Sequence, residues 1–184
     1  MKKGIIGKKL GMTQIFDEIG NVIPVTLIKA GPCVVVQKMT SEKEGFEAVQ
    51  LGYEEVAEKK LSQPEQGHLK KAGVGMVKHL KEFRLEDSSK MEVGDVIKAD
   101  MFAEGDKVDV TGISKGHGYE GQVKRCGGHR TPMTHGGGPV HRQAGSMGPT
   151  SSPSRIFKGH NGAGQMGVEQ VTVENLDIVK VDAE

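Results

Sequence analysis

Length, composition and charge restrict this chain to few classes of protein. Its 184 residues suffice for one main core, and only two cysteines, Cys33 and Cys126, are present, which excludes a disulfide framework. The N-terminus lacks the long apolar run of a signal peptide or membrane span, so we expect a cytoplasmic protein without a membrane partner. The net charge of +1 indicates no partner by itself, whereas 27 glycines predict that much of the chain lies outside a packed interior.

The first third of the sequence is typical of short β-strands. β-Branched and apolar residues gather in short runs, and turn residues separate these runs. The runs predict strands over residues 13–16, 22–29, 33–39 and 48–53. Cys33 opens the third run beside three valines, and we expect it to be a small buried residue. This pattern indicates a β-sheet or a β-barrel.

A short helix is predicted next, as part of a small α-containing insertion. Ser62 stands three residues before Glu65, which is the spacing of a capping box, and Pro64 suits the first turn. We expect the helix over residues 64–71, ending near Gly73. Alternating apolar residues then predict strands over residues 78–85, 93–99, 107–113, 170–174 and 176–181.

A glycine-rich window lies before the last two of these strands. Residues 112–167 hold 15 of the 27 glycines and five of the seven histidines. The window contains seven basic residues and one acid, Glu120, so its charge is +6 and the other residues together carry −5. The seven basic residues are Lys115, Lys124, Arg125, Arg130, Arg142, Arg155 and Lys158. A segment of this length without periodicity is either functional or disordered.

The composition of the window favours contact with RNA. Disordered linkers are usually rich in Ser, Glu, Lys and Pro, whereas this window mixes Gly, His and Arg. Glycine lets backbone amides approach phosphate oxygens, and arginine can bind phosphate through two parallel hydrogen bonds. An extended segment can also follow the irregular surface of RNA. A second basic group, Lys2, Lys3, Lys8 and Lys9, could reach the same RNA or could equally be a solvated strand end.

A metal site and two kinds of enzyme site compete with RNA binding. Cys126, His129, His135 and His141 offer the donors of a zinc site, but their spacing fits no strong zinc template. Cys126 and a histidine could act as nucleophile and base, but the loop holds no acid to orient the imidazole. The glycine-rich stretches also lack the G-x-x-x-x-G-K-[ST] pattern of a phosphate-binding loop. We therefore expect no catalytic residue, no metal and no cofactor.

Several stretches of the sequence resemble a known family. They are MKKGIIGKKLGMTQIF at the start, VDVTGISKGHGYEGQVKR in the middle, and THGGGPVHRQAGSMGP followed by RIFKGHNGAGQMGVEQVTVENLDIVKVDAE. Together, and in this order, they resemble the bacterial form of the universal large ribosomal subunit protein three over essentially the whole chain. The resemblance implies a structural, non-catalytic protein that binds large-subunit rRNA directly and has no small-molecule substrate.

The resemblance also implies a fold and a location. The fold is mainly β, with a translation-factor-like β-barrel from residues 1–56 and 93–184, a small α/β insertion over 57–92, and a long irregular Gly/Arg/His-rich extension over 124–158. The extension is expected to reach towards the peptidyl transferase centre. The barrel is expected near the 3′ region of the rRNA, beside neighbouring large-subunit ribosomal proteins. The resemblance further implies that the protein binds early in subunit assembly.

By this resemblance the rRNA contacts fall mainly in the extension. The residues carried over are Arg125, His129, Arg130, His135, His141, Arg142, Arg155 and Lys158. With Lys115, Lys124 and the four N-terminal lysines, they form the expected rRNA-binding set. Composition alone implies none of these individual contacts.

The sequence departs from the family pattern in three places. His117-Gly118-Tyr119-Glu120 stands where members commonly have Lys-Gly-Phe-Gln, which removes a positive charge and adds an acid. Pro149 stands where many members carry a glutamine that is methylated in some of them, so we expect no such modification here. Members usually continue beyond Val181–Glu184 through a strand and a basic tail, so we expect a trimmed sequence or a barrel completed differently.

Two other classes of function remain open from the sequence. A metal-dependent or cysteine-dependent enzyme acting on RNA would contain stoichiometric zinc or lose its activity on Cys126→Ser. A translation factor that visits the ribosome transiently would need a nucleotide-binding domain, and the sequence shows no such domain.

Overall fold

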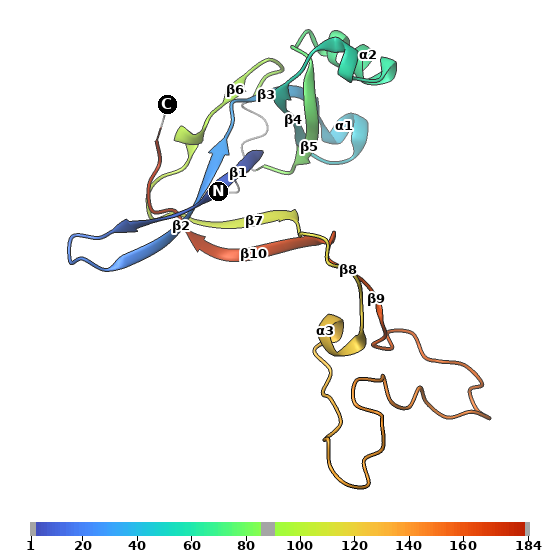
Figure 1. Ribbon diagram of the computed structural model, residues 1–184. Helices are drawn as coiled ribbons and strands as arrows, with labels where there is room; N and C mark the ends of the chain where they lie inside the picture. The colour runs from blue at the N-terminus through green and yellow to red at the C-terminus, as the bar shows by residue number, and fades with distance from the viewer. Residues whose placement is uncertain (1–2, 86–90, 183–184) are drawn as a thin grey trace. The chain divides into compact units, whose positions relative to one another are not determined.

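The computed structural model describes residues 3–85 and 91–182 (Figure 1). The chain divides into two compact units. Unit 1 comprises Met1–Lys107 with Asp177–Glu184, and unit 2 comprises Val108–Leu176. Strands are the main secondary structure, and those described belong to four separate sheets. No helix among the described residues combines the length and the apolar character that a membrane crossing requires.

Unit 1 contains a long two-stranded hairpin. β1 (Gly7–Phe16) pairs antiparallel with β2 (Val22–Ala30). The Asp17 carboxylate closes the turn because its Oδ1 atom accepts hydrogen bonds from the amides of Ile19 and Asn21, at 2.9 and 2.8 Å. β1 is longer than the strand predicted over residues 13–16. Its first half is rich in glycine and lysine, which do not indicate a strand in the sequence, and it forms a strand because it pairs with β2.

The core of unit 1 is built on an antiparallel sheet of four strands in the order β5-β4-β3-β6. The strands are β3 (Cys33–Met39), β4 (Ala48–Glu55), β5 (Val77–Phe83) and β6 (Val96–Ile97). The prediction for β3 is confirmed to the residue. β6 is shorter than predicted because a turn precedes it, in which the Glu92 amide donates to Asp95 Oδ2 at 2.8 Å.

Alternation along β3 and β4 gives this sheet two apolar faces. One face buries a cluster made of Cys33, Val35, Val49, Leu51 and Tyr53. The other face buries Val36 and Val77 against Leu69. Each fully buried valine or leucine stabilises the fold by roughly 1.5–3 kcal/mol. The prediction that Cys33 is a buried core residue is confirmed, since its exposed fraction is 0%.

Leu69 comes from α2 (Gln63–Ala72), which packs on the second face. The predicted capping box is present, because Glu65 Oε2 accepts hydrogen bonds from the amide and hydroxyl of Ser62 at 3.0 and 2.8 Å. Gly73 ends the helix with a φ of 70°, a conformation that favours glycine. The predicted helix is therefore confirmed, one residue longer at each end.

Three helices of a single turn escaped prediction. They are α1 (Ser41–Glu44), η1 (Glu58–Lys60) and η3 (Ala99–Met101). Segments of three or four residues are too short to show the 3.6-residue repeat of apolar positions by which a helix is recognised in a sequence. They connect the strands of unit 1 and contain no buried residue.

Unit 2 consists of two short β-ribbons in succession. β7 (Lys107–Ile113), found where predicted, pairs with β10 (Gln170–Asp177), and the hydroxyls of Thr111 and Thr172 form a hydrogen bond of 2.8 Å between them. Further along, β8 (Gly118–Glu120) pairs antiparallel with β9 (Gly164–Met166), and α3 (Gln122–Cys126) follows β8. β8, β9 and α3 were not predicted, because glycines interrupt every apolar run there.

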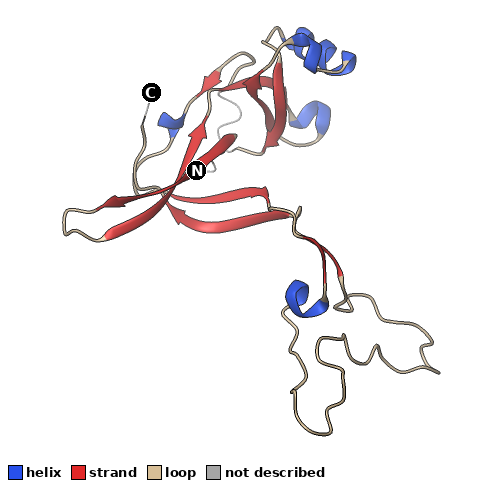
Figure 2. Cartoon of the chain, in the orientation of Figure 1, coloured by secondary structure: helices blue, strands red, loops and turns tan. Residues whose placement is uncertain are grey.

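Residues 127–163 connect α3 to β9 without any helix or strand (Figure 2). We call residues 127–159 of this segment the finger. Nearly all of its residues are exposed. Local turns shape it, such as the hydrogen bond from the Gly137 amide to the Thr134 carbonyl at 3.1 Å. The predicted extension began at residue 124, but residues 124–126 belong to α3.

The strands do not close into a barrel within the part of the chain that is described. β1 pairs with β2, β7 pairs with β10, and the four-stranded sheet ends at β5 and β6. No hydrogen-bonded ladder between described strands joins one sheet to the next. The fold class is therefore mainly β, with several small antiparallel sheets in place of the expected closed barrel.

Candidate nucleic-acid interface

The finger carries half of the residues predicted to contact RNA. Its exposed basic and histidine side chains are His129, Arg130, His135, Arg142, Arg155 and Lys158. His141 is half-buried, and its Nδ1 atom is buried without a hydrogen-bond partner among the described residues. The guanidinium of Arg155 lies 5.3 Å from the centroid of the Phe157 ring. Four cations of the finger are thus accessible to a partner.

At the base of the finger, Arg125 fastens α3 to the chain that enters β9. Its Nε donates to the Gln165 carbonyl and its Nη1 donates to the Gly162 carbonyl, both at 3.0 Å. The Cys126 thiol donates to the same Gly162 carbonyl at 3.7 Å. Arg125 was predicted to contact RNA, yet two of its donors bind the protein's own backbone. We call residues 114–126 and 160–169 the neck.

Hydrogen bonds also join the two chains of the neck to each other. The Ser114 amide donates to the Glu169 carbonyl at 2.9 Å, and the Glu169 amide donates to the Ser114 hydroxyl at 3.2 Å. The His117 amide donates to the Met166 carbonyl at 2.8 Å. Since all these partners belong to unit 2, the frame of the neck is held without any external partner.

Gly167 lies where the two chains of the neck approach closely. Its φ is 78°, and a Cβ atom added to it would lie 2.0 Å from the Lys115 carbonyl oxygen. Both the left-handed backbone and the lack of space require glycine at this position. The shape of the neck thus depends on this residue.

Lys124, another predicted contact, is paired within the neck. Its Nζ lies 2.5 Å from Oε1 of Glu120, which is four residues earlier in the sequence and ends β8. Glu120 is the acid that departs from the pattern of the resembling family. The pairing therefore reduces the positive charge that α3 presents to a polyanion.

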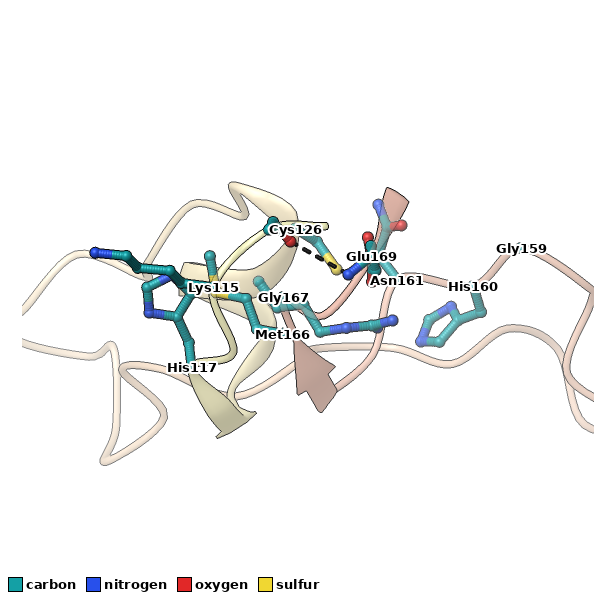
Figure 3. A pocket seen from close by; sticks show the side chains of 11 residues that line it. Lys115, His117, Cys126, Gly159, His160, Asn161, Met166, Gly167 and Glu169 are labelled. Carbon is teal, nitrogen blue, oxygen red and sulfur yellow. Dashed lines mark hydrogen bonds between the residues drawn. The ribbon is translucent and has the colours of Figure 1, made fainter. Parts of the chain in front are cut away.

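The neck surrounds an open hollow of about 660 Å³ (Figure 3). Its polar lining includes Lys115, His117, Arg125, His160, Asn161 and Glu169. Lys115 belongs to the predicted rRNA contacts, whereas His117, His160 and Asn161 were missed. The histidines are part of the glycine-rich window, but residues 117 and 160 are 43 positions apart, so nothing in the sequence indicates that they line one hollow.

Of the N-terminal lysines, Lys2 lies outside the described residues. Lys3 Nζ donates to the Met101 carbonyl at 2.6 Å and lies 3.5 Å from Asp106 Oδ2. Lys9 is exposed on β1. Lys3 therefore forms contacts within unit 1, which the sequence did not predict.

Three basic side chains lie close to the carboxylate of Glu54, a residue of β4. Its Oε1 lies 3.3 Å from Lys8 Nζ, and its Oε2 lies 3.6 Å from Lys78 Nζ and 3.4 Å from His79 Nε2. The hydrogen bond from Lys8, together with the charges of Lys78 and Lys8, lowers the pKa of Glu54. Lys8, also a predicted RNA contact, thus ties β1 to the four-stranded sheet.

Replacing Glu54 with glutamine should make stability less sensitive to acid. Because its pKa is lowered in the folded state, the carboxylate stabilises the fold above its ordinary pKa of about 4.3, and this contribution disappears as the pH falls through the lower folded value. In urea unfolding we expect the free energy of unfolding of the wild type to exceed that of the variant in the neutral range, and the difference should shrink as the pH falls below about 4.3. Glu18→Gln, at an exposed turn position, is the control. A gap that stays constant over this range would contradict the role of the ion cluster.

The alternative zinc and cysteine sites do not assemble. No three His, Cys, Asp or Glu side chains among residues 3–85 and 91–182 come together as a group that could hold a metal ion. Cys126 donates to a backbone carbonyl, as described above, and not to a histidine. The set of Cys126, His129, His135 and His141 is therefore not gathered into one site.

Part of the chain matches a known protein family. Residues 71–184 match the family model described as Ribosomal protein L3. The match covers 114 of the 184 residues, counted from residue 71 to residue 184, and it includes the whole of the neck and the finger.

Proposed function

Because the chain belongs to the ribosomal protein L3 family, we propose that its neck and finger are the parts that enter the large-subunit rRNA. Membership of this family makes the protein a structural component of the large ribosomal subunit that binds rRNA, and not an enzyme. The proposal assigns this binding to particular elements of the chain.

The observation that carries the proposal is the exposed, basic and irregular finger. Arg130, Arg142 and Lys158 are exposed and have no hydrogen bond or ion pair within the described part of the chain. Each such cation releases counterions when it meets a phosphate, which favours binding. The finger has too few apolar residues to build a core, so the burial that orders it comes from the RNA.

The contact set that we propose has two groups. The finger contributes His129, Arg130, His135, His141, Arg142, Arg155 and Lys158, and the neck contributes Lys115 and Lys124. Lys2, Lys3, Lys8 and Lys9 form a second, weaker group, because Lys3 and Lys8 already pair with Asp106 and Glu54. Arg125 acts chiefly as a positioning residue that holds the neck together.

Finer proposals rest on the resemblance of the sequence motifs. We propose that the finger points towards the peptidyl transferase centre, and that the protein binds early in assembly near the 3′ region of the rRNA, beside neighbouring ribosomal proteins. We also propose that residues 1–56 and 93–184 belong to one domain, with residues 57–92 as an insertion.

Binding of the isolated protein to purified rRNA tests the proposal. The wild type should bind large-subunit rRNA more tightly than small-subunit rRNA at the same salt concentration. A variant in which residues 128–158 are replaced by a short glycine linker should lose most of this preference. Equal binding of the wild type to both rRNAs, or an undiminished preference without the finger, would contradict the assignment.

A further inference from the structure

We propose that the hollow of the neck binds a single nucleotide that is turned out of the large-subunit rRNA. The inference rests on the proposed rRNA binding and goes beyond it, because it assigns one defined pocket in addition to contacts with the phosphate backbone. Single-stranded or bulged RNA is recognised in this way, by unstacked bases that side chains hold on their faces and edges.

The hollow has a suitable size and lining. Its volume of about 660 Å³ lies within the range of roughly 300–1,000 Å³ that is common for pockets holding small ligands. Lys115 and Arg125 supply positive charge on the lining, and His117, His160 and Asn161 supply hydrogen-bonding groups. Imidazole rings can also stack on bases. This combination fits a phosphate, a sugar and a base better than it fits an apolar ligand.

The walls of the hollow are fixed by the protein itself. The two hydrogen bonds from Arg125 to the Gln165 and Gly162 carbonyls hold α3 against the chain entering β9. The pair of bonds between Ser114 and Glu169 holds the opposite end. A pocket formed in advance loses little conformational entropy when the nucleotide enters it.

Several side chains on the lining are free to bind a ligand. Lys115, His117, His160 and Asn161 are exposed, and no side-chain hydrogen bond or ion pair is found for them within the described residues. The frame of the neck is therefore held by its backbone and by the side chains of Arg125, Ser114 and Cys126, and the four free side chains are not needed to hold it. Their substitution should leave the frame intact.

The arrangement of the lining suggests how the nucleotide lies. In Figure 3, Lys115 and His117 lie on one side, His160 lies on the other, and Met166 and Gly167 lie between them. The Lys115 ammonium has no ion pair among the described residues, so the phosphate is assigned to the side of Lys115 and His117. The base is assigned to the side of His160 and Asn161, which can stack on its face and bind its edge.

A double-mutant cycle on the full chain tests whether one nucleotide is shared. Lys115→Ala should lower the salt slope of binding to large-subunit rRNA by about one unit, because one phosphate contact is lost. His160→Ala should weaken binding roughly tenfold with an unchanged slope, because a stacking contact is lost. The double variant should weaken binding by less than the product of the two single effects, since both side chains hold the same nucleotide. Lys43→Ala, which removes an exposed lysine of α1, is the control and should have neither effect.

Three outcomes would overturn the inference, and they can be distinguished. If the wild type binds large-subunit rRNA but the two single variants bind as the wild type does, the hollow is not a nucleotide site, although the proposed function stands. If the loss of affinity in the double variant equals the product of the two single losses, Lys115 and His160 make independent contacts and do not hold one nucleotide. If a large-subunit rRNA fragment that the protein binds leaves the amide signals of His160 and Asn161 unshifted, no nucleotide of the rRNA enters the hollow. Failure of the wild type to bind rRNA at all would instead remove the proposed function itself.

Discussion

Replacing Arg130, Arg142, Arg155 and Lys158 together with alanine should lower the salt slope of rRNA binding by about three units. Each cation that neutralises a phosphate of RNA contributes about 0.7–0.9 to this slope, because it releases condensed counterions. At constant salt we expect affinity to fall at least about a hundredfold. All four side chains are exposed, so the fold should not change. Filter binding of large-subunit rRNA between about 50 and 200 mM salt measures the slope.

A matched variant separates contacts of the finger from the overall charge. Replacing Lys43, Lys59, Lys60 and Lys71 with alanine removes the same charge from exposed positions of unit 1. We expect this variant to change the slope by less than about one unit. An equal loss in both variants would show that long-range attraction, and not contact through the finger, determines binding.

Gly167→Ala should disrupt the neck and destabilise unit 2 by about 3 kcal/mol or more. A side chain at a φ of 78° is strained by about 1–2 kcal/mol, and the added Cβ would lie 2.0 Å from the Lys115 carbonyl oxygen, which must move. That movement should break the hydrogen bond between the His117 amide and the Met166 carbonyl. Hydrogen exchange at the amides of Ser114 and His117 reports the loss directly.

Gly159→Ala is the matched control for this prediction. Gly159 has nearly the same φ, 79°, but no atom lies within 4 Å of the Cβ position, so its substitution isolates the backbone strain. It should cost only about 1–2 kcal/mol and leave exchange at Ser114 and His117 unchanged. If both variants exchange equally fast at these amides, the close approach in the neck is not what holds its two chains.

The sequence predicted those elements whose signal is local. β3 and β7 were predicted to the residue, because runs of valine and alternating apolar residues continue along their whole length. α2 was predicted because Ser62, Pro64 and Glu65 form an N-terminal signal that does not depend on the rest of the chain. Pairing between segments that are distant in the sequence could not be predicted from local residue patterns. β8 and β9 are three residues each, and only their mutual hydrogen bonds make them strands.

The composition of the glycine-rich window predicted which segment would carry accessible basic side chains. It did not predict which individual basic residues bind groups of the protein itself. The exposed cations of the finger are accessible, as an RNA-binding segment requires. Lys3, Lys8 and Arg125, however, bind protein groups, which their charge alone could not reveal. Arg125→Ala would therefore loosen the neck as well as remove a charge. The salt slope of RNA binding by this variant would not report the number of phosphate contacts alone. Arg142, exposed and unpaired within the described residues, is the better single test.

The most direct test of the central claim is the behaviour of the tagged protein in cells that express it. Lysate is sedimented through a sucrose gradient after a high-salt wash, and the protein in the large-subunit fraction is quantified against rRNA. An rRNA-embedded structural component should remain there in stoichiometric amount, whereas the variant without residues 128–158 should be depleted. Release of the full chain into the soluble fraction at the top of the gradient would contradict the account.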